Sequence, residues 1–169
     1  LKILKMNLRE PNLINTFLEY FLKTPLKEKT LVEIGSGPSH LFWKKYFKRV
    51  ISYEDDKNYL TKDMIPFTKD YAEDNQFKYN LNLADYIIID NEPNRITRYE
   101  FACFTCKYVN HQASIILDNS NWHMKAFDFL KTFYFNKDFP GVDKYNSYTV
   151  TSLFDIRKNK KYIFETGID

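Results

Sequence analysis

Four short apolar runs that alternate with helix-like segments constrain the fold of this chain most strongly. The runs span residues 30–34, 50–54, 85–90 and 114–118. The uninterrupted isoleucines at 87–89 are typical of a strand that is buried on both faces. Strands that alternate with helices build a mostly parallel sheet covered by helices on both sides. The sequence therefore predicts an α/β fold with a doubly wound, mostly parallel sheet.

The remaining segments predict further helices and strands. Helical spacing predicts helices from Pro11 to a point before Pro25, over 39–48, over 57–72 with a kink at Pro66, over 94–109 and over 121–132. Strands are expected over 76–79, 135–139, 148–154 and 162–164, with a hairpin turn at 157–161. The strand over 135–139 is expected to end at Pro140-Gly141.

Length and charge bound the class of protein. The chain has 169 residues, enough for one domain with a substantial core, so we expect a single domain over residues 1–169. The net charge of +3 is too small to indicate a nucleic-acid partner by itself. No segment approaches the roughly 18 apolar residues of a membrane span, and the first residues lack a signal-peptide layout. Cys103 and Cys106 are interpreted as buried helix residues, which fits a cytoplasmic location.

Two glycines and two acids lie where a doubly wound sheet binds its ligand, at the carboxyl ends of the strands. Gly35 and Gly37 follow the first strand, and they let backbone N–H groups approach a ligand closely. Glu54 ends the second strand, where an acid can accept hydrogen bonds from both hydroxyls of a ribose. A nicotinamide-binding loop prefers a third glycine, but this chain has His40 at that place.

These segments together resemble the class I S-adenosylmethionine-dependent methyltransferases, over nearly the whole chain. The resemblance rests on residues 31–37, 50–56, 84–90 and 115–120, in that order. Residues 138–141, followed by 149–154, are similar to a small bacterial and phage subgroup of this family. The resemblance implies a Rossmann-like methyltransferase fold with a seven-stranded sheet, and S-adenosylmethionine as cofactor.

The resemblance also implies a set of cofactor-binding residues. They are Glu33, Gly35, Ser36, Gly37, Glu54, Asp55, Asn80 and Asp90. Glu33 would lie near the methionine amino group, the glycines would flank the methionine portion, and Glu54 would bind the ribose. The family often has an acid after the third strand that holds the adenine amino group. In this chain Asn80 or Asn82 would take that part, since an amide can bond an adenine edge.

Two chemistries are open for the transfer step. Asp90 and His123 are candidate catalytic residues, because a hydroxyl or protonated nitrogen acceptor needs a base. Alternatively Asp90, Asp118 and Asn119 resemble the magnesium ligands of the catechol-type O-methyltransferases, and oxygen ligands suit magnesium. Pro93 stands where that group has a lysine, which favours the metal-free version.

The expected acceptor is a small molecule, methylated at oxygen or nitrogen. Residues 90–93, Asp-Asn-Glu-Pro, differ from the Asp/Asn-Pro-Pro-aromatic loop of amino-methylating DNA enzymes. A nucleic-acid methyltransferase, another S-adenosylmethionine-using enzyme and a non-catalytic module remain alternatives, and a homo-oligomer is left open. Arg98 is expected either to meet an anionic substrate or to pair with Glu92 and Glu100.

Overall fold

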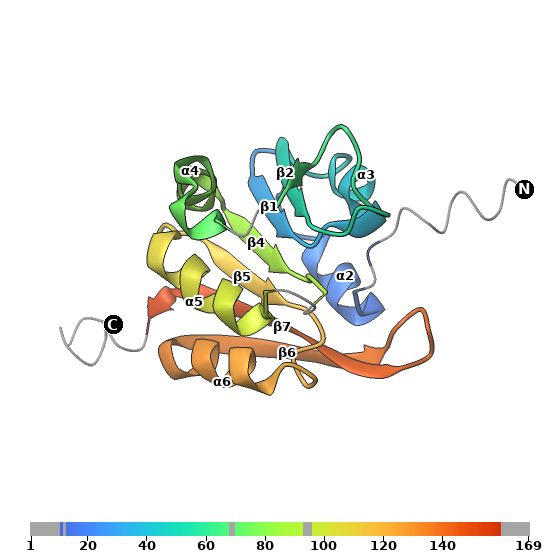
Figure 1. Cartoon of the computed structure of the whole chain (residues 1–169). Helices are drawn as coiled ribbons and strands as arrows, with labels where there is room; N and C mark the ends of the chain where they lie inside the picture. The colour runs from blue at the N-terminus through green and yellow to red at the C-terminus, as the bar shows by residue number, and fades with distance from the viewer. Residues whose placement is uncertain (1–10, 12, 68–69, 93–95, 160–169) are drawn as a thin grey trace, which may run out of the picture.

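The computed structural model describes residues 11, 13–67, 70–92 and 96–159. Within these ranges seven strands form one sheet in the order β3-β2-β1-β4-β5-β7-β6 (Figure 1). The strands are β1 (Thr30–Ile34), β2 (Arg49–Glu54), β3 (Ile65–Pro66), β4 (Tyr86–Ile89), β5 (Ser114–Leu117), β6 (Tyr134–Val142) and β7 (Tyr148–Asn159). Strands β1 to β5 are parallel to one another, whereas β7 runs antiparallel to both β5 and β6. The expected doubly wound, mostly parallel, seven-stranded sheet is confirmed.

Helices cover both faces of this sheet (Figure 1). The α-helices are α2 (Asn15–Phe21), α3 (His40–Trp43), α4 (Asn75–Leu83), α5 (Arg98–Tyr108) and α6 (Met124–Phe133), with short 3₁₀ turns η1 (Gly37–Ser39) and η2 (Tyr71–Glu73). Helices α4, α5 and α6 lie on one face, and α2 and α3 lie on the other. None of the described helices is long and apolar enough to cross a membrane.

The sheet separates two hydrophobic cores, and alternate residues of the central strands β4 and β5 enter opposite cores. Ile87 and Ile89 pack toward α4, α5 and α6, whereas Ile88 packs toward α2 and α3. The same alternation occurs in β5, where Ile115 and Leu117 face one core and Ile116 the other. Because side chains of a strand point alternately to the two faces, a strand covered on both sides needs apolar residues at every position. The apolar triplets of the sequence have this physical cause.

The helix expected over 57–72 is wrong for the described part of that segment, residues 57–67 and 70–72. This part contains turns, the short edge strand β3 beside β2, and the 3₁₀ turn η2. Pro66 lies within β3, at the outer edge of the sheet. Proline breaks a helix interior but is tolerated on an edge strand, since its missing N–H faces no neighbour there.

The strand expected over 76–79 is also wrong, because these residues lie inside α4. Asp74 precedes the helix, and its side chain accepts hydrogen bonds from the backbone N–H groups of Gln76 and Phe77. An aspartate at this position satisfies N–H groups that have no partner within the helix and so favours helix initiation. The capping signal at Asp74 therefore outweighs the local strand pattern.

Other boundaries shift by smaller amounts. The first described helix begins at Asn15 rather than Pro11, and the helix expected over 39–48 is reduced to η1 and α3, followed by turns. Strand β6 continues through Pro140-Gly141, and β7 runs to Asn159, so the hairpin turn expected from 157 is wrong where described. The strand expected over 162–164 lies outside the described residues, and the single domain over 1–169 stays a prediction. Cys103 and Cys106 lie in α5 as half-buried free thiols.

We predict that Thr97→Ala destabilises the protein by about 1 kcal/mol, the usual cost of losing an N-cap side chain. Thr97 and Glu100 form a reciprocal capping box at the start of α5, in which each side chain bonds the backbone N–H of the other residue. The control is Thr105→Val in the same helix, because the buried Thr105 hydroxyl has no hydrogen-bond partner among the described residues. Urea unfolding should show a lower free energy of unfolding for Thr97→Ala and an unchanged one for Thr105→Val. Equal decreases in the two variants would contradict the capping role.

Candidate functional site

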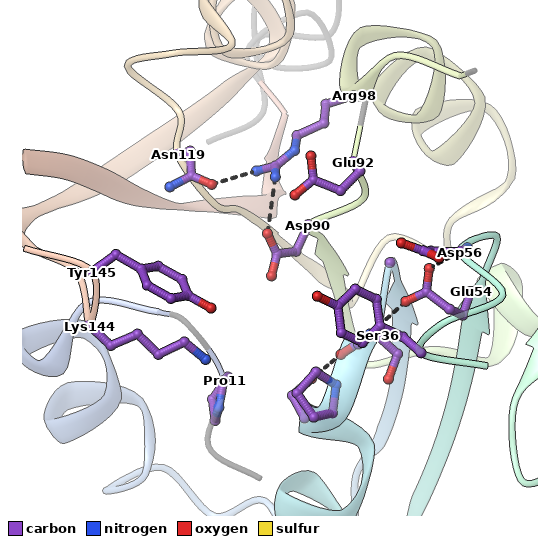
Figure 2. A pocket seen from close by; sticks show the side chains of 15 residues that line it. Pro11, Ser36, Glu54, Asp56, Asp90, Glu92, Arg98, Asn119, Lys144 and Tyr145 are labelled. Atoms are coloured by element: carbon purple, nitrogen blue, oxygen red, sulfur yellow. Dashed lines mark hydrogen bonds and ion pairs between the residues drawn. The ribbon is translucent and has the colours of Figure 1, made fainter. Parts of the chain in front are cut away.

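A polar pocket lies at the carboxyl ends of the parallel strands (Figure 2). Its lining comes from the turn after β1, the loop after β2, the ends of β4 and β5, the start of α5 and the turn between β6 and β7. The lining residues are Pro11, Gly35, Ser36, Gly37, Pro38, Ser39, Glu54, Asp56, Tyr59, Asp90, Glu92, Arg98, Asn119, Lys144 and Tyr145. Ligands of doubly wound sheets bind at this end, so this pocket is the candidate site.

The two glycines after β1 differ in the space around them. Gly35 has a φ of +82°, and a Cβ atom there would lie 2.2 Å from the Cα atom of Asn91. The close approach of the chain after β4 therefore excludes any side chain at this position. Gly37 has a φ of +50°, and its Cβ would face open space. Only Gly37 is thus a position where a side chain would extend into the pocket without meeting the protein.

Glu54 closes the glycine turn onto the end of β2. Its Oε2 accepts a hydrogen bond of 2.6 Å from the Gly37 N–H, and its Oε1 accepts bonds of 2.9 Å from the Asp55 and Asp56 N–H groups. Burial raises the pKa of Glu54, and the backbone N–H bonds oppose that rise. The carboxylate therefore lies at the pocket wall, fixed in orientation by three backbone bonds. Asp56 lines the pocket beside it, whereas the expected Asp55 does not.

Glu33 is buried beneath the glycine turn and does not line the pocket. Its carboxylate accepts hydrogen bonds from the hydroxyls of Ser36, Ser39 and Ser52, at 3.0, 2.5 and 2.8 Å. Burial raises the pKa of Glu33 to about 7, although the three hydroxyls act in the opposite direction. Ser36 and Ser39 do line the pocket, so Glu33 positions them from below.

Asn80 is not at the end of a third strand, where it was expected, but in helix α4, and it does not line the pocket. The side chain is 2% exposed. Its amide nitrogen donates to the Tyr53 hydroxyl at 2.8 Å, and its oxygen accepts from Gln76 at 3.0 Å. These contacts connect α4 to β2 and give Asn80 a structural role. Asn82, the alternative, donates to the backbone oxygen of Tyr108 on the same side of the sheet.

Arg98 connects the side chains expected to hold a metal ion. Its guanidinium donates to Asp90 Oδ1 at 3.1 Å and to Asn119 Oδ1 at 3.2 Å (Figure 2). It also donates to the backbone oxygens of Asn91, at 3.0 Å, and Asp118. The pairing expected with Glu92 or Glu100 is therefore replaced by the contact with Asp90, and Glu100 belongs to the helix cap.

The Asp118 carboxyl is fully buried beside Asp90 and does not line the pocket, and its Oδ1 accepts from the Thr151 hydroxyl at 2.8 Å. Burial raises the pKa values of Asp90 and Asp118, and for Asp90 the nearby Asp118 charge adds to the rise. No three His, Cys, Asp or Glu side chains among the described residues form a group that could hold a metal ion. Asp90 Oδ1, Asn119 Oδ1 and the Asp118 backbone oxygen instead accept hydrogen bonds from Arg98, so these three residues do not fit the expected magnesium site.

His123 lies just before α6 and does not line the pocket. Burial, with a contribution from the Arg98 charge, lowers the pKa of His123 to about 4. The imidazole is therefore neutral throughout the physiological range. A loss of activity near pH 6.5, which an ordinary histidine base would produce, is not expected from this residue.

The turn between β6 and β7 supplies pocket residues that sequence reasoning missed. Lys144 and Tyr145 lie on the opposite side of the pocket from Glu54 (Figure 2). Asp143 holds the turn, since its Oδ1 accepts from the N–H groups of Tyr145 and Ser147, both at 2.9 Å. Asn146 has a φ of +64°, a conformation that asparagine tolerates. An Asp-x-x-Asn-Ser pattern between two strands is a turn signal, but its position over the pocket depends on the antiparallel register of β7.

Solved structures of methyltransferases have a fold similar to that of this chain. An O-methyltransferase from Bacillus cereus, in complex with SAH, matches with a TM-score of 0.62 and 14% identity, over 89% of this chain and 84% of that one. The O-methyltransferase TomG from Streptomyces achromogenes, in complex with SAM, has a TM-score of 0.55 and 12% identity, over 82% and 75%. A precorrin-6Y C5,15-methyltransferase from Geobacter metallireducens has a TM-score of 0.55 and 13% identity, over 86% and 90%.

The chain therefore has the fold of the class I S-adenosylmethionine-dependent methyltransferases, and the resemblance stated from the sequence is confirmed at the level of fold. These structures share the Rossmann-like sheet, and at such identities the likeness shows the fold alone. No protein-family model matches the chain, and no curated protein matches it significantly.

We predict that Glu33 makes the protein less stable as pH rises. Its pKa is raised from 4.5 to about 7, so the folded state keeps the proton that the unfolded chain releases. Stability from this group is present in full below pH 4.5 and is lost as pH rises to about 7, by about 3 kcal/mol. The pKa values of Asp90 and Asp118 are also raised, so wild type alone would not isolate Glu33. The comparison therefore uses Glu33→Gln. The free energy of unfolding, measured with urea at pH 5 and pH 8, should change less between the two pH values in the variant than in wild type. An identical change would contradict the buried-acid role.

Proposed function

We propose that this protein transfers a methyl group from S-adenosylmethionine to a small-molecule oxygen or nitrogen acceptor. The observation that carries the proposal is the joint formation of one pocket by the Gly37 turn and Glu54 at the carboxyl ends of β1 and β2. The methyltransferase fold supports it, and so do the two similar O-methyltransferase structures that are complexes with SAH and with SAM.

The pocket residues fit this cofactor. Gly37 leaves open space where any other residue would place a side chain, so a ligand can approach the backbone closely. Glu54 presents a fixed carboxylate that can accept the two hydroxyl groups of a ribose. Ser36 and Ser39 provide hydroxyls at the side where the methionine portion is expected. When bound, the cofactor would supply an electrophilic methyl group on a positively charged sulfur.

The charge of the pocket favours a small acceptor over a nucleic acid. Four acids line it, Glu54, Asp56, Asp90 and Glu92, against two basic residues, Arg98 and Lys144. Such a lining attracts the cationic sulfur and repels the phosphates of a polyanion, whose binding needs basic contacts. The chain also carries basic residues after α3, such as Lys44 and Lys48, but they are exposed outside the pocket.

Asp90 is the side chain that we propose as the base toward the acceptor. It lies in the middle of the pocket lining between the glycine turn and the β6–β7 turn, whereas His123 lies outside the lining (Figure 2). Arg98 holds one of its oxygens, so the carboxyl has a fixed direction. Lys144 and Tyr145 on the opposite wall would contact the acceptor.

We predict that SAH binds the wild-type protein and that Glu54→Gln weakens this binding at least about tenfold. The substitution keeps the side-chain shape but removes the charge, and a hydrogen bond to a charged group contributes roughly 1.5–3 kcal/mol. Isothermal titration calorimetry with SAH measures the change. Glu28→Gln is the matched control, since Glu28 is an exposed acid that pairs only weakly with Lys48 at 3.4 Å.

Gly37→Asn separates binding from folding in the same assay. Asparagine tolerates a φ of +50°, and its side chain would extend into the open space of the pocket. The variant should therefore fold, as judged by circular dichroism, and lose most of its SAH affinity. If both Glu54→Gln and Gly37→Asn bind SAH as tightly as wild type, the cofactor does not occupy this pocket.

We further predict that labelled methyl groups pass from S-adenosylmethionine to small molecules with an oxygen or nitrogen acceptor and not to RNA or DNA. Asp90→Asn should reduce the transfer while SAH affinity stays within a few-fold, because the acid is proposed to act on the acceptor. Transfer assays against a small-molecule panel and total nucleic acid test both points. Labelled nucleic acid would instead support the alternative class of methyltransferase.

A further inference from the structure

Four oxygen atoms from four residues converge on the guanidinium of Arg98. Two are side-chain oxygens, on Asp90 and Asn119, and two are backbone oxygens, on Asn91 and Asp118. The Arg98 side chain is 4% exposed, and Asp90 is 26% exposed. This is therefore a largely buried cage of oxygen atoms that opens to the pocket on the Asp90 side.

The chemistry of this cage is that of a site for a hard divalent cation. Carboxylate, amide and backbone carbonyl oxygens are the ligands that magnesium and calcium prefer. In this protein the same atoms serve as acceptors for Nε, Nη1 and Nη2 of Arg98, and the guanidinium supplies the positive charge inside the cage.

We propose that the Arg98 guanidinium replaces a divalent cation at this end of the sheet, as a permanent cation supplied by the chain. Arginine stays protonated at all relevant pH values, and its planar fork spreads several donors over several acceptors. The charge next to Asp90 is consequently fixed, and it does not depend on the metal content of the surroundings.

A metal ion and the guanidinium exclude each other from this cage. Both would need the same Asp90, Asn119 and Asp118 oxygens, and a doubly charged ion beside a buried guanidinium would be strongly repelled. Thr151 holds one oxygen of the neighbouring Asp118 carboxyl, since its hydroxyl donates to Asp118 Oδ1. It follows that removal of the guanidinium should turn the cage into a cation site.

The test is a titration with Mn²⁺ followed by electron paramagnetic resonance, on wild type, Arg98→Ala and the double variant Arg98→Ala with Asp90→Asn. We expect no specific Mn²⁺ binding by wild type and one site in Arg98→Ala, at least about tenfold tighter than any wild-type binding. The double variant should lose that site, because the Asp90 carboxylate is gone from the cage. Methylguanidinium should compete with Mn²⁺ in Arg98→Ala, which a merely structural role of Arg98 would not produce.

Two controls keep the test decisive. Arg49→Ala removes an exposed arginine at the start of β2 and should behave like wild type. Arg98→Met retains the buried apolar stem, in case Arg98→Ala does not fold, and it should bind Mn²⁺ as well.

A wild-type protein that binds one Mn²⁺ would overturn the proposal if a folded Asp90→Asn variant loses that ion, whether or not the Arg98 variants fold. A folded Arg98→Ala or Arg98→Met without a Mn²⁺ site would overturn it too. The titration needs no SAH, so a failure of SAH binding would refute the proposed function and leave this result in force.

Discussion

The contact between Arg98 and the ends of two adjacent strands is the interaction on which the pocket depends. Arg98 donates to the backbone oxygens of Asn91, two residues after β4, and Asp118, directly after β5. Asn91 in turn lies over Gly35 at the end of β1, too close for a Cβ atom. One side chain of α5 therefore fixes the relative positions of three strand ends. Breaking a buried ion pair of this kind costs about 3–5 kcal/mol, because the remaining charge stays buried without a partner.

The central strands and the glycine turn could be predicted from the sequence because local pattern and global packing agree there. The isoleucines of β4 are apolar at every position since both of their faces meet a hydrophobic core. Gly37 and Glu54 lie at the two strand ends where the fold requires a close backbone approach and an acid, and the structure brings them together at 2.6 Å. The sequence predicts the same role for Gly35, but in the structure it is the chain after β4 that leaves no room for a Cβ atom there.

The parts that the sequence did not reveal depend on contacts between distant segments. The assignment of Asn80 failed because a capped helix took the place of a predicted strand, and the amide then met Tyr53 across the core. The sequence indicates that Arg98 has an anionic partner, but it does not reveal the contacts with Asp118 and Asn119, which lie 20 and 21 residues further along the chain. A pattern of charges cannot tell which of several acids an arginine will contact. That choice is made by the register of β4 against β5.

The β6–β7 turn separates two tasks of this small protein. The turn is held by Asp143 and by the left-handed Asn146, neither of which lines the pocket, while Lys144 and Tyr145 between them do. The residues that give the turn its shape are thus distinct from the residues that face a ligand. Natural variation or laboratory selection can exchange the two pocket-facing side chains without disturbing the backbone that carries them. Substrate preference in such a scaffold can diversify while the opposite wall, built on β1 and β2, stays unchanged.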